Sequence, residues 1–268
     1  MSRLRNIIQS IWPRSDYRKH EPFGASDQPP AGTLKIPAHV AVVMDGNGRW
    51  ARRQKLPRSA GHRAGAENLH RLCDLCIRYQ IKYVTVYAFS TENWSRPSEE
   101  VKTLMDLFVE FFNRYDAELA DRDIRLRFSG DEDDLPDHVL KTMRRAEAVS
   151  ADRKTLQLIV AFNYGSRREL VEACRRICRS VQAGSITVDQ ISEQTLSDSL
   201  YIPDIPDPDL IIRPSGEMRL SNFLLWQAAY AELWFSDVLW PDFNESHFVA
   251  ALEAYTHRDR RFGGVQSS

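Results

Sequence analysis

The chain has 268 residues, of which 43% are hydrophobic and 27% charged, and its formal net charge is −1 at pH 7. This length suffices for one sizeable core. The balanced charge excludes a nucleic-acid protein that relies on a broad basic field, so an anion-binding site would need local arginines. We find no signal peptide and no apolar run near the ~20 residues of a membrane span, and we expect a cytoplasmic protein.

The first 36 residues differ from the rest of the chain. Apolar residues recur at helical spacing from Leu4 to Trp12, arginines surround them, and a stretch rich in proline and glycine follows. This pattern predicts a short basic amphipathic helix and a linker over residues 1–36. The helix could make peripheral contact with the inner face of the cytoplasmic membrane. A frayed tail and a helix docked on its own domain remain alternatives.

From Pro37 onward, strand and helix patterns alternate. Apolar stretches predict six strands, at residues 40–44, 83–89, 124–129, 156–163, 210–212 and 233–235. Helical spacing predicts helices at 64–78, after an N-cap at Ser98, at 136–150, at 166–182 and from about Ser246. Strands joined by helical crossovers indicate an α/β fold. We therefore expect residues 37–268 to form a single domain, with a central, mostly parallel six-stranded sheet flanked by helices.

The four cysteines form two pairs, Cys73 with Cys76 and Cys174 with Cys178. This spacing could supply four thiolates to a zinc ion. Both pairs, however, fall on the apolar stripes of predicted helices. We therefore expect small buried thiols in the core at all four positions.

A polar turn follows directly after the first predicted strand. Its residues are Asp45, Gly46, Asn47, Gly48, Arg49 and Trp50. The glycines let backbone N–H groups approach an anion closely, and a carboxylate there can hold a hard cation. The turn therefore predicts an oxyanion site beside a metal, although a plain turn with a capping aspartate is an alternative.

Further polar segments follow the second and fifth predicted strands, at residues 90–96 and 213–221. In parallel sheets, ligands bind outside the carboxyl ends of the strands, so these segments should lie near the Asp45 turn. Arginines occur in both, and the planar guanidinium group meets phosphate oxygens with two parallel hydrogen bonds. Two arginine-bearing loops at one cleft predict two anionic groups.

Several segments resemble the cis-prenyltransferases, and most closely the bacterial undecaprenyl diphosphate synthases. They are HVAVVMDGNGRWA, GHRAGAE, YAFSTENWSRP, RPSGEMRLSNFLLWQAAYAELWF and WPDF, and the likeness extends over about residues 36–264. The resemblance implies repeated addition of isopentenyl diphosphate to an allylic starter, usually farnesyl diphosphate, with cis geometry. It also implies magnesium as cofactor, a homodimer, and undecaprenyl diphosphate as the lipid carrier for cell-wall glycans.

The resemblance also implies roles for individual residues of this sequence. The allylic diphosphate is expected to bind Gly46, Asn47, Gly48, Arg49, Trp50, Arg58 and His62. Further substrate contacts are expected from Ser90, Thr91, Glu92, Trp94 and Arg96. Isopentenyl diphosphate is expected to bind Arg213, Arg219, Leu220 and Ser221. His62 could instead cap a helix, and Met218 stands where some relatives have histidine.

Two carboxylates, Asp45 and Glu232, are implied as magnesium ligands, and Asp45 is also implied to be catalytic. Glu232 lies at the entrance of the last predicted strand, away from the other loops. Either that strand is misplaced or Glu232 acts near a subunit boundary. The resemblance nominates Asn93 as proton acceptor, but a carboxamide is a feeble base. Asn93 could instead orient the substrate while the released diphosphate takes the proton.

A hydrophobic tunnel for the growing chain is expected between two predicted helices. Its wall residues would be Leu69, Leu72, Ile77, Leu104, Met105, Phe108 and Phe112, with Ala66 and Ala88 keeping it open and Leu156 near its floor. Each of these side chains could equally be core. Two rivals remain, a cis-prenyl synthase of shorter product and a non-catalytic subunit. The second would lack the metal aspartate and most of the arginines, which are present here.

Overall fold

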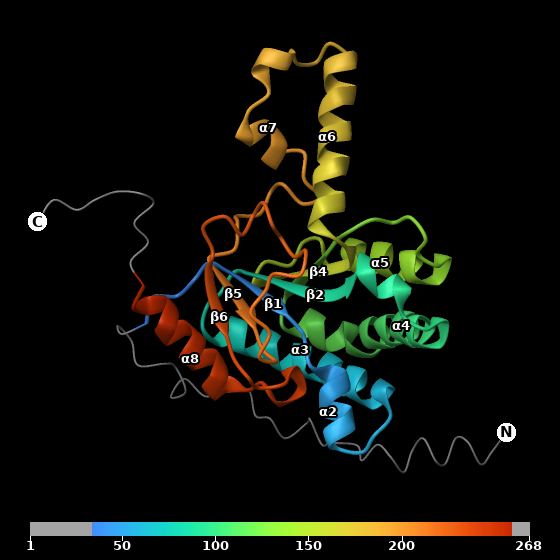
Figure 1. Ribbon diagram of the computed structural model, residues 1–268, viewed down its shortest axis with the longest axis vertical. Coiled ribbons are helices and arrows are strands. Elements are labelled where there is room, and N and C mark those ends of the chain that lie inside the picture. Colours follow the sequence, from blue (N-terminus) through green and yellow to red (C-terminus); the bar gives the residue numbers. More distant parts are fainter. Residues whose placement is uncertain (1–33, 259–268) are drawn as a thin grey trace, which may run out of the picture. The chain divides into compact units, whose positions relative to one another are not determined.

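The computed structural model describes residues 34–258 (Figure 1). A six-stranded sheet forms its centre, in the order β3-β4-β2-β1-β5-β6, and every neighbouring pair is parallel. The strands are β1 (His39–Val43), β2 (Tyr83–Ser90), β3 (Ile124–Ser129), β4 (Leu156–Tyr164), β5 (Leu210–Arg213) and β6 (Glu232–Phe235). The prediction of an α/β fold with six strands is confirmed, and the observed sheet is wholly parallel.

Helices cover the sheet and project from it. The α-helices are α2 (Asn47–Arg53), α3 (Arg58–Arg78), α4 (Ser98–Asp121), α5 (Asp137–Ser150), α6 (Ser166–Gln182), α7 (Glu193–Ser197) and α8 (Glu245–Thr256). Short 3₁₀ helices lie at η3 (Thr91–Ser95), η4 (Val188–Gln190) and η5 (Trp240–Asp242). Figure 1 shows α6 and α7 extending away from the sheet as an arm. None of the helices within residues 34–258 is long and apolar enough to cross a membrane.

The core lies on both faces of the sheet because successive side chains of each strand point to opposite faces. On one face, Val40 and Val42 join a large cluster built with α3, α4, α5 and α8. On the other face, Ala41 and Val43 join a smaller cluster that contains Tyr87 and Phe223. Strands buried on both faces read as continuous apolar runs, which is why they were recognisable in the sequence.

Helix α3 begins at Arg58, six residues before the predicted start. The predicted helix included Gly65 but left out Gly61, and glycine disfavours helix interiors. Both glycines are buried against α2. A Cβ atom at Gly61 would lie 2.0 Å from the backbone oxygen of Asn47, and one at Gly65 would lie 2.3 Å from Asn47 Oδ1. Glycine is therefore required here for the close approach of α3 to the turn that follows β1.

Helix α4 begins at Ser98, but Pro97 is its N-cap, so the predicted capping role of Ser98 is wrong. The ring of Pro97 fixes its φ, which is −52°, and a ψ of 138° places the residue outside the helical conformation. Helix α8 has Asn244 as its cap, and the Asn244 side chain accepts hydrogen bonds from the N–H groups of Ser246 and His247.

The cysteine prediction is half right. Cys73 and Cys76 are buried in the main cluster, and burial raises the pKa of Cys73 to about 12. Cys174 and Cys178 are exposed, so the expectation of core thiols there is wrong. Helix α6 reaches beyond the sheet, and it buries Ala173 and Ile177 instead. The predicted N-terminal helix and the linker before residue 34 lie outside the described residues and stay predictions.

His39 is a buried histidine whose two ring nitrogens both have partners. Nδ1 lies 2.7 Å from the carbonyl oxygen of Pro206, and Nε2 lies 2.8 Å from Thr85 Oγ1. Because a carbonyl only accepts, Nδ1 carries the proton and Nε2 accepts from the Thr85 hydroxyl. Burial lowers the pKa of His39 to about 4, so the folded protein holds this ring neutral.

Replacing His39 with asparagine should flatten the acid side of the stability profile. In the wild type, the unfolded chain binds a proton near pH 6.5 that the folded chain takes up only near pH 4. Stability from His39 is therefore complete above pH 6.5 and lost as the pH falls, by up to about 3 kcal/mol. Urea unfolding at about pH 7.5 and pH 5 measures this loss. Equal losses in the wild type and H39N would contradict the assignment.

Candidate active site

A cleft of about 600 Å³ opens at the carboxyl ends of β1, β2 and β5. Its walls also come from α2 and the first turns of α3 and α4. The sequence-predicted site residues that line it are Asp45, Gly46, Asn47, Gly48, Arg49, Arg58, His62, Ser90, Asn93, Arg96, Arg213 and Ser221. Residues far apart in the chain thus meet at one edge of the sheet, as parallel topology requires.

Asp45 lies at the junction of α2 and the loop after β5. Its Oδ1 accepts a hydrogen bond of 2.6 Å from the Gly46 N–H, and its Oδ2 accepts one of 3.0 Å from Arg213 Nη2. Burial raises the pKa of Asp45, but hydrogen bonds from Arg213, Ser215 and Gly46 outweigh it and leave the pKa lowered. Asp45 is therefore a carboxylate at neutral pH, and its side chain is one-third exposed to the cleft.

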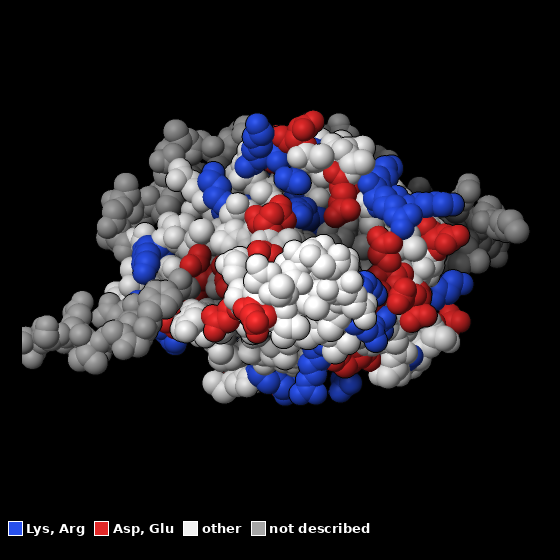
Figure 2. Space-filling model, turned by 90° about the horizontal axis from the view of Figure 1, so that it is seen from above, with Lys and Arg blue, Asp and Glu red and all other residues white. Residues whose placement is uncertain are grey.

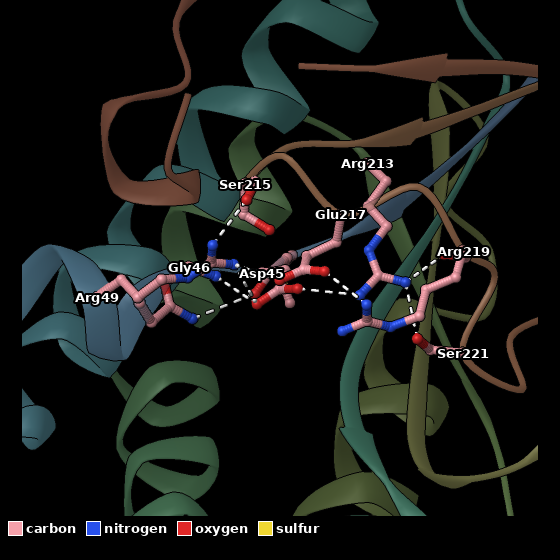
Figure 3. A network of polar contacts seen from close by, with 10 residues as sticks. Asp45, Gly46, Arg49, Arg213, Ser215, Glu217, Arg219 and Ser221 are labelled. Atoms are coloured by element: carbon pink, nitrogen blue, oxygen red, sulfur yellow. Dashed lines mark hydrogen bonds and ion pairs between the residues drawn. The ribbon is translucent and has the colours of Figure 1, made fainter. Parts of the chain in front are cut away.

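Arg213 is almost fully buried, with 4% of its surface exposed. Its guanidinium group donates to Asp45, to the Ser221 hydroxyl at 2.8 Å and to the backbone oxygen of Arg219 (Figure 3). Arg49 approaches Asp45 from the opposite side, and its Nη1 donates to the backbone oxygen of Ser215. The carboxylate is thereby held between two guanidinium groups, one buried and one exposed.

A second cationic group gathers around Glu100 in the first turn of α4. Its carboxylate lies 3.0 Å from Arg96, 3.2 Å from Arg58 and 3.5 Å from His62. Burial and the charges of Arg96 and Arg58 lower the pKa of His62, while Glu100 raises it, and the net shift is downward. The cleft therefore holds two arginine clusters that also contain carboxylates, Asp45 and Glu217 beside Arg49 and Glu100 beside Arg58 and Arg96.

Known proteins are similar to this chain over most of its length. Residues 43–263 match a family model described as "Putative undecaprenyl diphosphate synthase". The chain belongs to the cis-prenyltransferase family. An isoprenyl transferase of Heliobacterium mobile is 53% identical over 232 residues, which are 87% of this chain and 89% of the relative. An isoprenyl transferase of Thermotoga maritima is 51% identical, over 87% of this chain and 99% of the relative.

Solved structures of family members are also similar to this chain. A lavandulyl diphosphate synthase from Lavandula x intermedia, in complex with dimethylallyl diphosphate, superposes with a TM-score of 0.82 at 35% identity. The match covers 85% of this chain and 98% of that one. A structure described as "a probable undecaprenyl diphosphate synthase" from Campylobacter jejuni gives a TM-score of 0.72 at 30% identity, over 86% and 100% of the two chains. The prenyltransferase fold is therefore shown for this chain.

The predicted residues outside the cleft lining of this cis-prenyltransferase are Trp50, Thr91, Glu92, Trp94, Arg219, Leu220 and Glu232. Several of them connect cleft segments to the body of the fold. Trp50 Nε1 donates to Asp242 at 2.7 Å, and Trp94 Nε1 donates to Asn163 at 2.7 Å. Arg219 is paired with Glu217 and is mostly exposed, and Leu220 packs on the smaller cluster.

The sequence did not point to Arg52, Leu56 and Tyr87, which also line the cleft. Arg52 lies on the first helix after the Asp45 turn, and that helix was not predicted. Tyr87 was hidden in the apolar run of β2. The contacts of Glu100 with Arg58, His62 and Arg96 were also not predicted. The position of Glu100 in the first turn of a helix does not indicate which side chains from other segments lie beside it.

Asn93 is held by the backbone of its own turn. The Ser90 N–H donates to Asn93 Oδ1 at 3.2 Å, so the oxygen of the carboxamide is already an acceptor. The remaining polar group, Nδ2, can only donate. This geometry suits a side chain that orients an oxygen-rich ligand better than one that removes a proton.

Glu232 lies at the opposite end of the sheet from Asp45. It pairs with Leu210 at the start of β5, whereas Asp45 lies beyond the last residue of β1. The Glu232 carboxylate lies 2.7 Å from Arg258 Nη1. Across residues 34–258, no group of three His, Cys, Asp or Glu side chains could hold a metal. Asp45 alone fits the way magnesium is usually held, by one or two carboxylates together with substrate phosphates.

Replacing Glu100 with glutamine should strengthen anion binding in the cleft. The change removes a negative charge from beside Arg58, Arg96 and His62, and those groups then meet an incoming anion without competition. Ion pairs whose arginine partner still reaches solvent, as Arg58 and Arg96 do, contribute up to about 1 kcal/mol each, so the dissociation constant for inorganic diphosphate should fall about 3- to 10-fold. Isothermal titration calorimetry measures it, with Glu99→Gln as control. Unchanged or weaker binding would show that Glu100 does not compete.

Proposed function

We propose that this chain condenses isopentenyl diphosphate repeatedly onto an allylic diphosphate with cis geometry. Farnesyl diphosphate is the starter we favour, and undecaprenyl diphosphate, the lipid carrier for cell-wall glycans, is the product. The observation that carries the proposal is the presence of two separate cationic clusters in one cleft, since the reaction brings together two diphosphates. The Arg58–His62–Arg96 cluster would hold the allylic diphosphate, and the Arg213 cluster would hold isopentenyl diphosphate.

In each proposed cycle, negative charge develops on a diphosphate that lies beside one of these clusters. The allylic C1–O bond breaks and diphosphate leaves with the electron pair. The double bond of isopentenyl diphosphate then attacks C1 through its C4, and a proton leaves C2 to form the new cis double bond. Charge develops on the departing diphosphate, so preorganised guanidinium groups lower the barrier by electrostatic stabilisation.

A magnesium ion would be held by Asp45, whose carboxylate is ionised and faces the cleft. When bound, magnesium would neutralise diphosphate oxygens and act as a Lewis acid toward the leaving group. Asn93 would orient the reacting diphosphates, with the released diphosphate as proton acceptor. The backbone N–H groups of Asn47 and Gly48 at the start of α2 would add partial positive charge.

The growing chain would extend from the inner end of the cleft, where Ala88 and Leu104 form its apolar lining. The predicted wall residues Leu69, Met105, Phe108 and Phe112 pack as buried core beyond it. Each added isoprene unit would gain about 3–4 kcal/mol from apolar burial, so growth is favourable and release into water is not. Product release would then need a membrane, and contact through the segment before residue 34 stays a prediction.

One incubation tests the function. The protein is mixed with farnesyl diphosphate, labelled isopentenyl diphosphate and magnesium, and the chain length of the product is measured. Product of eleven isoprene units is the expected result. A shorter product would replace undecaprenyl diphosphate with the shorter-chain alternative, and the absence of product would leave only the non-catalytic subunit.

We further propose a homodimer in which Glu232 serves the site of the partner copy. Three features support a contact between copies: β6 is an edge strand, Tyr230 beside it is 71% exposed, and α6 presents an apolar face with Val171 half-exposed. Viewed toward the end of the α6–α7 arm, Figure 2 shows a largely uncharged surface with charged side chains around it. Exposed apolar side chains such as Val171 are typical of contact sites.

Mixing inactive variants tests this arrangement. If Asp45 and Glu232 of different copies form one site, a dimer of D45N with E232Q contains one fully intact site. Refolding the two variants together should then restore up to about a quarter of wild-type turnover, since random pairing makes about half of the dimers mixed. Either variant refolded alone is the control. No recovery, in dimers shown to be mixed by mass, would contradict a shared site.

A further inference from the structure

The loop after β5 contains an unusual run of strained backbone. Ser215, Ser221, Asn222 and Leu224 all have positive φ angles, of 89°, 53°, 63° and 47°. Residues other than glycine rarely adopt this left-handed conformation, and each persists only where surrounding contacts hold it. The loop carrying Ser221 is therefore fixed by partners outside itself.

Asn222 contacts those partners, which lie in two other segments of the chain. Its Nδ2 donates a hydrogen bond of 2.8 Å to Glu92 Oε1 in η3, after β2. Its Oδ1 accepts one of 2.9 Å from the N–H of Arg167, and its backbone oxygen accepts one of 2.8 Å from the N–H of Ser166. One residue thereby joins the segments that follow β2, β4 and β5.

The junction is closely packed. Gly165, which precedes α6, packs against Thr91 of η3 and against Asn222. A Cβ atom at Gly165 would be 2.6 Å from Thr91 Oγ1 and 2.8 Å from Asn222 Nδ2. Next along the chain, the Phe223 ring stacks on Tyr87, with ring centroids 4.6 Å apart. Neither η3 nor the Ser221 loop can shift without disturbing the other.

The bond between Asn222 and Glu92 spans the two proposed substrate sites. Ser221, one residue before Asn222, accepts from the buried Arg213. Asn93, one residue after Glu92, lines the cleft with Arg96. The hydrogen bond therefore sets the distance between a group of the isopentenyl diphosphate site and a group of the allylic site.

We propose that Asn222 is a positioning residue that locks η3 to the loop after β5 and so fixes the two diphosphate sites relative to each other. The inference rests on the proposed function, because it concerns how the two substrates are aligned. Alignment affects the chemical step more than the binding of either substrate, and a displacement of about 1 Å can cost about 10²-fold in rate. Loss of the lock should therefore appear in kcat.

The decisive variant is Asn222→Asp. Aspartate tolerates the positive φ and can still accept from Arg167, but it cannot donate to Glu92 and places a carboxylate against it. We expect kcat to fall about 10- to 100-fold, with KM for each substrate within about threefold of wild type. In the double variant N222D/E92Q, the introduced carboxamide can donate to the introduced carboxylate, which restores the link with the donor and acceptor exchanged. The kcat of this double variant should therefore be at least about fivefold above that of N222D.

Asn222→Gly provides a second test, because glycine accepts the backbone conformation while removing both side-chain bonds. Asn244→Asp is the matched control, since Asn244 caps α8 in a similar way outside the cleft. Circular dichroism and thermal unfolding establish that each variant is folded. Should the wild type make no product, the proposed function is wrong and the inference falls with it. An active wild type matched in kcat by folded N222D and N222G, or a double variant no faster than N222D, would overturn the positioning role alone.

Discussion

Replacing Asp45 with asparagine should reduce turnover on the order of 10³-fold, as expected when one preorganised electrostatic group is lost. The substitution is nearly isosteric, and the new carboxamide oxygen can still accept from the Gly46 N–H. The negative charge beside Arg213 and Arg49 disappears, and with it the proposed magnesium ligand. Affinity for the allylic starter should change little, because Arg58, His62 and Arg96 lie in the other cluster.

Steady-state kinetics separate these effects. KM for farnesyl diphosphate should stay within about threefold of wild type while kcat falls, which identifies an interaction made mainly in the transition state. Raising the magnesium concentration should not restore turnover. Asp106→Asn, at an exposed carboxylate of α4 that lies opposite His138, is the control. Turnover of D45N within about tenfold of the wild type would contradict the role of Asp45.

Much of the sheet could be predicted from the sequence because β1, β4 and β5 are buried on both faces. Continuous apolar runs such as 40–44 are too short for a buried helix, and each one ends in a polar turn. Ligands of parallel sheets bind outside the carboxyl ends of the strands. This regularity predicted that Asp45, Ser90 and Arg213 lie close together, without any knowledge of strand order. Those positions depend only on local sequence and on parallel topology.

The failures occurred where tertiary contacts override local preference. Gly61 lowers helix propensity, yet α3 runs through it, and Asn47 occupies the space that a side chain there would need. The stripe containing Cys174 has core-like spacing, yet α6 leaves the sheet and exposes it. Periodicity predicts that a face is apolar, and it carries no information about what covers that face.

The same limit applies to the site. The sequence identified Arg58, His62 and Arg96 as substrate ligands by resemblance, but it could not show that Glu100 already lies among them. It also could not show that Asn222 joins two loops, because its partners are 130 and 55 residues away. Pairings over such distances are set by the packing of whole elements.

Replacing Arg213 with lysine should be nearly as damaging as losing Asp45, even though the charge is kept. The guanidinium group of Arg213 donates in one plane to Asp45, Ser221 and the backbone oxygen of Arg219. A single ammonium group on a flexible stem cannot reach three separated acceptors at once. Unmade hydrogen bonds involving charged groups cost on the order of 1–3 kcal/mol each, so kcat/KM for isopentenyl diphosphate should fall about 10²- to 10³-fold.

A change in pH dependence should accompany the loss of activity. Arg213 holds the pKa of Asp45 below its ordinary value, against the effect of burial. Stability from ionised Asp45 is present above the pKa of the unfolded chain and lost as the pH falls through the lower pKa of the folded chain. With the guanidinium group gone, the pKa of Asp45 should rise, so the acid limb of kcat/KM should move to higher pH. Arg122→Lys is the matched control, because Arg122 likewise donates to a carboxylate, of Asp74, and to a backbone oxygen, of Glu118. An acid limb that stays in place while kcat/KM falls would show that Arg213 binds substrate without governing the charge of Asp45.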